Sequence, residues 1–549
     1  MAHKTEIGKD ILEMLMFSLY PEAETIYREY LQNATDAIRE ACDAGVLDSM
    51  SDGHISIRIN QSKHSVVIQD NGIGIPAISA ESTFKDIAKT PKRKKDYLAG
   101  YYGIGRLVGA GYCRQLIFET SAKGESLESK IVFDVDKIRE ILEDDENDMG
   151  AAEVIDSATV FSQGPAAEEE HYFRVLLNDI LIEYPELLDE AYIRDYLKQI
   201  APIDYLAEFK NSLIKPSLSG DDDEYLPLYY EMNRVKVSLN DYVDIRKPYG
   251  LRIDGTDDQI YELRFFTINS DKHEALAWGW YAITEFSTQI PDRDPNNNNL
   301  VLTRGMRLRI HNIQIGNQNF FDGTGYFKQA RSNKYFNGEI HIIHPRIKPT
   351  TDRSDLAPTA EALEFKEKIR EFFNYEMQDV YQTANKVKKQ LERYEAATGI
   401  LSSSSSSSAG NTEPIASPEL AKKLSDAQKE QEKASEEIRK QLDAPRAKKI
   451  GVKAMLGVYQ QKMEQIREEA KTHVLEGGPS VQYGSGQTGL PTPKPTITEE
   501  MEAMADKYGS EGVGMLKKVF SLIDRHTPTR SKEVVSTIKS AVLNDLKNE

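Results

Sequence analysis

The chain has 549 residues, which is too long for a single hydrophobic core and predicts roughly three or four domains. Its formal net charge is −19, from 88 acidic and 69 basic residues, and this balance disfavours broad binding to nucleic acid. The chain has two cysteines, Cys42 and Cys113, which suggests a reducing compartment. No run approaches the roughly 18 apolar residues of a membrane helix, and the N-terminus lacks the apolar core of a signal peptide. We therefore expect a soluble protein of the cytoplasm.

Helix and strand patterns are mixed over residues 1–182, which predicts an α/β (α+β) domain. Apolar residues recur at helical spacing from about Glu22 to Ala41. Residues 55–59 alternate as a strand, and Val66-Val67-Ile68 is a buried strand that leads into a glycine turn. We therefore expect helices layered over a sheet.

The helix predicted from about Glu22 carries three polar residues on one stripe. Glu29, Asn33 and Asp36 follow an i, i+4, i+7 pattern beside the apolar face. In isolation, such a stripe is more often solvated surface than a site. As a site, it would place Asn33 to bind magnesium through its carbonyl oxygen and Glu29 to accept a proton from an attacking water.

An acidic residue and two glycines follow the buried strand. An unpaired carboxylate at Asp70 would be costly there, and an exocyclic adenine amine would supply a donor. Gly72 and Gly74 leave room for the backbone to approach a flat base. By itself, the run Asp-Asn-Gly-Ile-Gly also fits an ordinary strand-ending turn.

A second glycine loop spans Gly100 to Gly105, and its backbone N–H groups could hold phosphate oxygens. A Rossmann fold would require a strand directly before it, but residues 91–97 are basic and polar. We interpret Ile87 to Ala99 as a lid with Lys89 near the phosphates, although a solvated loop explains Lys92 to Lys95 equally well. The helix stripe, the acidic glycine turn and the glycine loop, in this order, predict an ATP site of the Bergerat fold.

The rest of the chain divides by composition. Residues 185–398 predict a second α/β domain, in which Trp278-Gly279-Trp280-Tyr281 is interpreted as buried core rather than a ligand cage. The remaining predicted parts are a Ser-rich linker at 399–417, a helical region at 418–475 that is split at Pro445, a Pro/Gly linker at 476–497, and a small helical bundle at 498–549 that would gain from dimerisation.

These motifs resemble the GHKL superfamily of ATPases, and most closely the heat-shock-protein-90 chaperones, including the bacterial HtpG-like form. Glu29 to Ala37 is similar to their first ATP-site helix, Phe84 to Thr90 to their lid entrance, and Gly100 to Gly105 to their glycine loop. The similarity is specific over about residues 7–125. It implies an S5-like second domain after the ATPase domain, and ATP and Mg²⁺ as cofactors.

By this resemblance Glu29 is the catalytic base, Asn33 the magnesium ligand and Asp70 the adenine reader. The adenine-site threonine would fall at Thr159, although the glycine that usually precedes it is absent. The other ATP contacts implied are Asp36, Gly72, Gly74, Lys89, Gly100, Gly103, Ile104 and Gly105.

In the second domain, Lys348 to Leu356 resembles the loop that carries a γ-phosphate-sensing cation in these chaperones. It resembles equally the lysine loop of MORC-type ATPases, with Arg353 in place of the lysine. Such a cation would stabilise the charge that develops in phosphoryl transfer. The alternative is a surface ion pair of Arg353 with Asp352 or Asp355.

The resemblance implies a homodimeric, ATP-hydrolysing clamp that remodels protein clients in a chaperone-like manner. The alternative is a MORC-like nucleic-acid clamp in genome defence, which the basic residues Arg446, Lys448, Lys449 and Lys453 favour slightly and the net charge opposes. A histidine kinase is disfavoured, because no short His-bearing helical hairpin precedes the ATP domain and a large α/β domain follows it.

Overall fold

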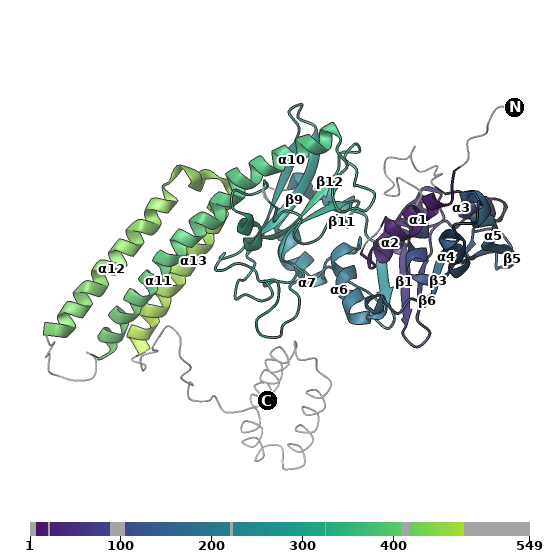
Figure 1. Cartoon of the computed structure of the whole chain (residues 1–549). Helices are drawn as coiled ribbons and strands as arrows, with labels where there is room; N and C mark the ends of the chain where they lie inside the picture. The colour runs from purple at the N-terminus through teal and green to yellow at the C-terminus, as the bar shows by residue number, and fades with distance from the viewer. Residues whose placement is uncertain are drawn as a thin grey trace, which may run out of the picture. The chain divides into compact units, whose positions relative to one another are not determined.

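The computed structural model of the protein describes residues 7–19, 22–87, 105–219, 223–323, 325–407 and 418–476. In these ranges the chain forms two β-sheets with helices packed on them, and then three long helices (Figure 1). The predicted mixed α/β class is therefore confirmed. No helix in the described ranges combines the length and apolar character that crossing a membrane requires.

Several predictions concern residues outside these ranges. They are the phosphate contacts of Lys89, Gly100, Gly103 and Ile104, most of the lid, and the parts predicted for residues 477–549.

The first sheet has seven strands in the order β5-β4-β3-β6-β2-β1-β7. Neighbouring strands are antiparallel, except that β1 and β7 are parallel. The strands are β1 (His54–Asn60), β2 (Ser65–Asp70), β3 (Cys113–Ser121), β4 (Leu127–Asp134), β5 (Thr159–Pro165), β6 (Tyr172–Ile180) and β7 (Lys236–Leu239).

Helix α2 (Thr25–Asp43) is the main helix packed on this sheet, as its apolar periodicity predicts. Its residues Ile26, Leu31 and Ile38 are buried in one core with Ile57 and Ile68 of the sheet. The other helical segments here are α1 (Asp10–Glu13), η1 (Met14–Ser18), η2 (Met50–Asp52), α3 (Ala77–Lys85), η4 (Gly105–Gly111), α4 (Val135–Glu143), α5 (Ala151–Ser157), η5 (Pro185–Leu188) and α6 (Glu190–Ile200).

Strand β7 comes from beyond the predicted end of the first domain. It pairs with β1 from His54 opposite Lys236 to Ile57 opposite Leu239. Val237 and Leu239 are fully buried in the core that α2 covers. The boundary predicted at residues 182–185 is therefore wrong for this segment, because β7 covers an edge of β1 that would otherwise be unpaired.

The second sheet has five strands in the order β11-β10-β12-β9-β8, with β10 and β12 parallel and the other pairs antiparallel. Trp278 and Trp280 are each 1% exposed on β9 and lie in an aromatic core with Tyr205, which confirms that they are core residues. The strands are β8 (Glu262–Asn269), β9 (Ala275–Ile283), β10 (Gly305–Ile310), β11 (Ile313–Ile315) and β12 (Asn337–Ile342). The helical segments are α7 (Ala207–Phe209), η6 (Lys210–Ile214), α8 (Lys215–Ser217), η7 (Asp223–Tyr225), α9 (Leu226–Tyr230), η8 (Ala330–Tyr335), α10 (Ala360–Phe372) and η9 (Phe373–Met377).

Three long helices follow, α11 (Gln378–Ser407), α12 (Pro418–Leu442) and α13 (Ile450–Glu476), with the short η10 (Pro445–Lys448) between the last two. They lie side by side in Figure 1, and α11 contacts both of the others. The predicted break at Pro445 is confirmed. The start predicted for the linker, residue 399, is wrong because α11 continues to Ser407. Extending an existing helix costs much less free energy than nucleating a new one, so the serines continue the helix.

Candidate nucleotide-binding site

The polar stripe of α2 is largely buried. Glu29 and Asp36 are 6% and 4% exposed, whereas Asn33 between them is partly exposed. This excludes the interpretation of the stripe as solvated surface. Burying a carboxylate costs free energy unless hydrogen-bond donors or cations pair with it, so Glu29 and Asp36 should each have such partners in the folded protein.

The two carboxylate oxygens of Glu29 face two different segments. Oε1 accepts a hydrogen bond from Nε of Arg353 at 2.9 Å, in an ion pair whose side chains are 7% and 5% exposed. On the other side, a Cβ added to Gly105 would lie 2.2 Å from Oε2, so any larger residue there would displace the Glu29 carboxylate. The structure thus brings together three sequence-predicted elements: the α2 stripe, the end of the glycine loop and the loop of the second sheet.

The loop that carries Arg353 is internally braced. Pro349 and Leu356 form an isolated bridge, and Arg353 adopts a left-handed φ of 58°. Asp352 accepts hydrogen bonds from the Thr350 hydroxyl at 2.7 Å and from the Ser354 N–H at 3.2 Å, while Asp355 forms an ion pair with Lys366 at 2.8 Å. Both acidic neighbours are thus engaged elsewhere, and the proposed surface pair of Arg353 with one of them is not what the structure shows.

The acidic glycine turn packs directly on α2. Asp70 is 4% exposed, and its Oδ1 accepts the Gly72 N–H at 2.8 Å. The Ile73 N–H donates to the Ala37 carbonyl oxygen of α2 at 3.0 Å. A protein donor therefore meets one oxygen of the buried Asp70, and the adenine contact that the sequence suggested for this residue stays a prediction.

Glycine is required at two points of this turn. A Cβ on Gly72 would lie 2.6 Å from the carbonyl carbon of Ala37. Gly74 has a φ of +69°, and a Cβ there would lie 1.9 Å from the Ser121 carbonyl oxygen. The close approach that the sequence predicted is thus made to protein backbone on both sides of the turn.

Two residues that sequence reasoning missed hold the same turn. Thr120 Oγ1 accepts the Ile75 N–H at 2.9 Å and donates to the Tyr172 carbonyl oxygen at 2.8 Å. A ring nitrogen of His171, Nδ1, lies 2.9 Å from the Gly72 carbonyl oxygen. Neither residue lies in a motif, and only the pairing of β2 with β6 and of β6 with β3 brings them to Asp70.

Thr159 is not in this group. It begins β5 at the edge of the first sheet, opposite Phe133, and strands β4, β3 and β6 separate it from β2. The sheet threonine nearest to the acidic turn is Thr120. It pairs with Phe173 of β6, and Phe173 in turn pairs with Asp70 of β2.

The segment just after the glycine loop is anchored to α2 and α3. The Tyr30 hydroxyl donates to the Arg106 carbonyl oxygen at 2.9 Å and accepts the Gly109 N–H at 3.0 Å. The Arg106 guanidinium donates to the carbonyl oxygens of Thr83 and Asp86, and burial lowers its pKa. These bonds tie η4 to the chain on the N-terminal side of the predicted lid.

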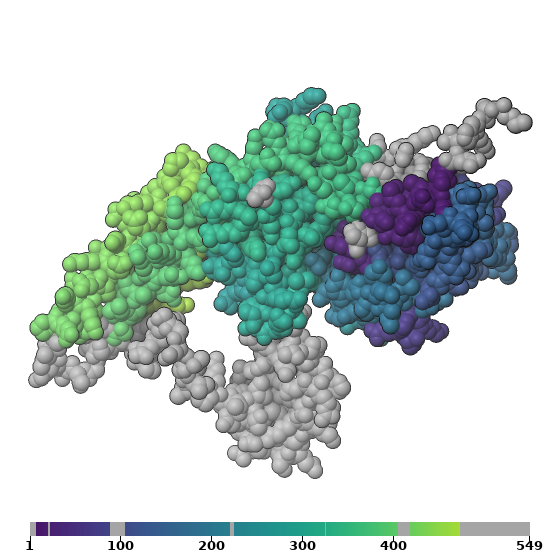
Figure 2. Space-filling model, in the orientation of Figure 1, coloured from purple at the N-terminus to yellow at the C-terminus, as the bar shows by residue number. Residues whose placement is uncertain are grey.

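A hairpin turn of the second sheet also faces α2. His311 and Asn312 connect β10 to β11 with φ of 51° and 65°, the pair of positive values typical of a tight hairpin. Burial lowers the pKa of His311 to about 4, with the charge of Asp36 opposing this shift and those of Arg39 and Arg353 adding to it. The charge of Asp36 on α2 therefore acts on a residue of the second sheet's hairpin. Figure 2 shows the surface of the N-terminal residues, in purple, in contact with the green surface of residues from the second-sheet region.

Asn33 is the residue of the stripe that could bind a magnesium ion. Mg²⁺ prefers oxygen ligands and is usually held by one or two protein groups together with substrate phosphates. The Asn33 side chain makes no hydrogen bond to any described residue, and its amide lies on the same helix face as Glu29. The described residues contain no cluster of three or more histidine, cysteine or acidic side chains able to hold a metal. The residues fit an ion that is held mainly by nucleotide phosphates.

Comparison with known proteins agrees with this geometry. The family model described as histidine kinase-, DNA gyrase B- and HSP90-like ATPase matches residues 22–162. The chaperone protein HtpG of Buchnera aphidicola subsp. Schizaphis graminum is 28% identical over 149 residues, which are 21% of this chain and 24% of the relative. The HtpG of Legionella pneumophila strain Lens is 32% identical over 121 residues, 19% of each protein, and that of Bordetella parapertussis 33% over 115 residues, 18% of each.

The match covers all of α2, the acidic glycine turn and η4, but not the loop of Arg353. The aligned region spans only about a fifth to a quarter of the length of these curated relatives, 19% and 24% for the first two. Residues 22–162 of this chain therefore match the histidine kinase-, DNA gyrase B- and HSP90-like ATPase family.

Proposed function

We propose that the first domain binds ATP with Mg²⁺ and hydrolyses it to ADP and phosphate, with Glu29 as the catalytic base and Arg353 as the cation that senses the γ-phosphate. The observation that carries this proposal is the buried Glu29–Arg353 pair, at 2.9 Å, beside Gly105. A base, a cation and the end of a glycine loop converge there from three distant parts of the sequence. A stability role alone explains this poorly, because a buried ion pair is weak evidence for stability.

The chemistry follows from these positions. Water attacks the γ-phosphorus, the bond from that phosphorus to the bridging oxygen of ADP breaks, and the water proton passes to the carboxylate of Glu29. Asn33 would hold the magnesium ion, which when bound offsets the charge on the phosphate oxygens. Asp70, whose Oδ1 accepts the Gly72 N–H, would read the adenine amine.

In this proposal, Arg353 changes partners during the cycle. Without nucleotide it neutralises Glu29, and with nucleotide it turns to the γ-phosphate and frees Glu29 to accept a proton. Charge stabilisation by one preorganised donor is typically worth roughly 100- to 1,000-fold in rate. Because Arg353 lies on the loop between β12 and α10, this exchange would couple the nucleotide state to the arrangement of the two domains.

We further propose that the whole chain works as a dimeric, chaperone-like clamp on protein clients. The support is the likeness of its first domain to proteins named HtpG chaperones and the second α/β domain that follows. The test uses the purified full chain with ATP and a reporter enzyme that is unfolding under heat. Suppression of aggregation that depends on ATP and fails in Glu29→Gln is expected. Salt-dependent retention of duplex DNA without any effect on the reporter would instead indicate the nucleic-acid clamp.

A further inference from the structure

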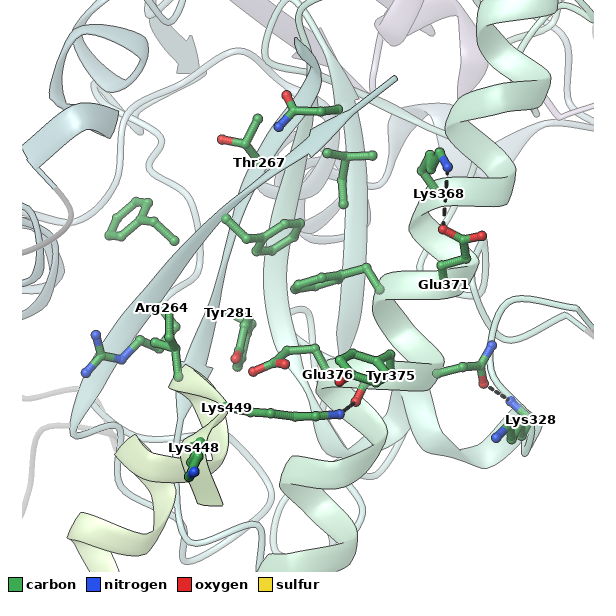
Figure 3. A pocket seen from close by; sticks show the side chains of 17 residues that line it. Arg264, Thr267, Tyr281, Lys328, Lys368, Glu371, Tyr375, Glu376, Lys448 and Lys449 are labelled. Atoms are coloured by element: carbon green, nitrogen blue, oxygen red, sulfur yellow. Dashed lines mark hydrogen bonds and ion pairs between the residues drawn. The ribbon is translucent and has the colours of Figure 1, made fainter. Parts of the chain in front are cut away.

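A groove of about 910 Å³ runs along the outer edge of the second sheet, far from Glu29 in the sequence. One wall is β8, from Arg264 to Asn269 without interruption. The opposite wall is formed by α10 and η9, and Lys448 to Ile450 close one end. Figure 3 shows Arg264 and Thr267 on the strand, with Lys368 and Glu371 on the helix across from them.

Strand β8 is an edge strand, because it pairs only with β9. The Leu263 N–H donates to the Ser217 hydroxyl at 3.0 Å and therefore points away from the sheet. Backbone direction alternates along an antiparallel strand, so the N–H and C=O groups of Phe265 and Thr267 also point outward, into the groove. In the described part of the chain no strand pairs with this outer side of β8, so the ladder that β9 begins ends there.

The groove is cationic, although the whole chain carries a net charge of −19. Glu371 and Glu376 are its two acidic lining residues. Its basic lining residues are Arg264, Lys328, Lys368, Lys448 and Lys449.

Not all of these cations are available to a partner. Arg264 is paired with Glu262 at 3.0 Å, Lys368 with Asp271 at 2.7 Å and Lys449 with Asp379 at 2.8 Å. Lys328 and Lys448 form no ion pair with any described residue. These two exposed lysines are therefore the basic lining residues that can pair with an acidic partner.

The floor of the groove is apolar. The rings of Phe266 and Phe372 stack with centroids 4.3 Å apart, and both line the groove with Tyr281. A free strand edge, an apolar floor and basic residues at the rim match an extended polypeptide with alternating side chains better than they match a phosphate backbone.

We propose that this groove binds an acidic polypeptide segment of about six residues, which adds to the sheet as a strand beside β8. The outward groups of Phe265 and Thr267 form the main-chain hydrogen bonds, and Lys328 and Lys448 attract the acidic side chains. Peptide binding at this position does not depend on the proposed ATPase activity, and it is measured without nucleotide.

The probe is a fluorescein-labelled peptide of about six residues in which glutamate and valine alternate, titrated with the full chain and followed by fluorescence polarisation. A second peptide has the same side chains but N-methylated backbone amides. We expect the first peptide to bind in saturable fashion and the N-methylated one at least about tenfold more weakly, because strand addition needs backbone donors.

Two matched pairs of variants locate the site. Thr267→Pro removes an outward N–H and is compatible with an edge strand, so it should weaken binding about tenfold, whereas Thr267→Val, which keeps the N–H, should not. The double variant Lys328→Glu/Lys448→Glu should weaken binding by a similar factor. The control Lys63→Glu/Lys123→Glu makes the same charge change at two exposed residues of the first domain and should not weaken binding. Melting temperatures are recorded for each variant to confirm folding.

Three results would overturn the proposal. They are no saturable binding of the acidic peptide, equal binding of its N-methylated form, or Thr267→Pro binding as the parent does while folded. Duplex DNA that displaces the peptide and is itself lost in the double lysine variant would identify a phosphate-binding surface instead.

Discussion

Arg353 donates its Nε hydrogen to Glu29 Oε1 at 2.9 Å, although 324 residues separate them in the chain. Both side chains are almost fully buried, at 5% and 7% exposure. This contact joins the helix that carries the proposed catalytic base to a loop of the second sheet. It also explains why neither residue is free to act as an ordinary surface charge.

Glu29→Gln should bind ATP normally and hydrolyse it about 100- to 10,000-fold more slowly, because a general base acts on the transition state. Glutamine keeps an oxygen to accept the Arg353 hydrogen bond, so this variant should remain folded. ATP binding is measured by calorimetry and turnover by phosphate release. Near-normal turnover would remove Glu29 from the catalytic role.

Asp70→Asn should abolish nucleotide binding, because the adenine amine loses its charged acceptor. The asparagine oxygen can still accept the Gly72 N–H that Asp70 accepts at 2.8 Å, so the turn should persist. Calorimetry with a non-hydrolysable ATP analogue checks this, with Asp52→Asn on the exposed 3₁₀ helix η2 as the control. Unchanged affinity in Asp70→Asn would place the adenine elsewhere.

Arg353→Ala should lower turnover roughly 100- to 1,000-fold if it senses the γ-phosphate. It also leaves Glu29 buried without its cation, and removing one partner of a buried pair typically costs about 3–5 kcal/mol of stability. The double variant Glu29→Gln/Arg353→Gln removes both charges and should recover much of that stability without recovering turnover. Turnover per folded molecule that stays normal in Arg353→Ala would assign the residue a purely structural role.

These assays require the full chain. A fragment ending at residue 182 would lack β7, which covers the edge of β1 in the first sheet. ATP affinity measured on such a fragment would therefore report lost structure as well as lost contacts.

Stability should fall in acid because of His341. This side chain is 4% exposed, and burial lowers its pKa from 6.5 to about 4, although its contact with Glu339 at 3.2 Å opposes the shift. Between these two pH values the unfolded chain binds a proton that the folded chain excludes. The contribution of His341 to the free energy of unfolding is therefore present in full above pH 6.5 and is lost as the pH falls toward 4. The loss amounts to up to about 3 kcal/mol.

His341→Gln should flatten this part of the pH dependence in thermal melts between pH 4 and 6.5. His273→Asn, at an exposed turn position with a φ of 64°, is the matched control and should leave it unchanged. An equally steep loss of stability in His341→Gln would assign the effect to other groups.

Removing residues 477–549 should leave ATP binding intact and lower turnover, if the helical bundle that the sequence predicts at 498–549 dimerises the chain and raises the effective concentration of the ATPase domains. The cut must follow α13, since Val452, Met455 and Leu456 of that helix are buried in the core of the second sheet. Sedimentation and turnover are measured on the same truncation. A truncated chain that still dimerises would place the interface elsewhere.

The sequence by itself determined the elements whose patterns are local. The α2 periodicity, the Glu29–Asn33–Asp36 stripe, the Asp70 turn and the helix break at Pro445 all depend on residues within a few turns of one another. Short-range spacing is enough to specify such features, because helix and strand periods decide which side chains share a face.

Only the tertiary structure decided what those elements meet. The partner of Arg353, the bracing of the acidic turn by Thr120 and His171, and the membership of β7 in the first sheet join positions far apart in sequence. Thr159 illustrates the limit: it is a candidate because it lies on a predicted strand, although the usual preceding glycine is absent, and strand order places it at the edge of the sheet far from β2. Strand order and domain docking are set by packing across the whole chain, and no local spacing encodes them.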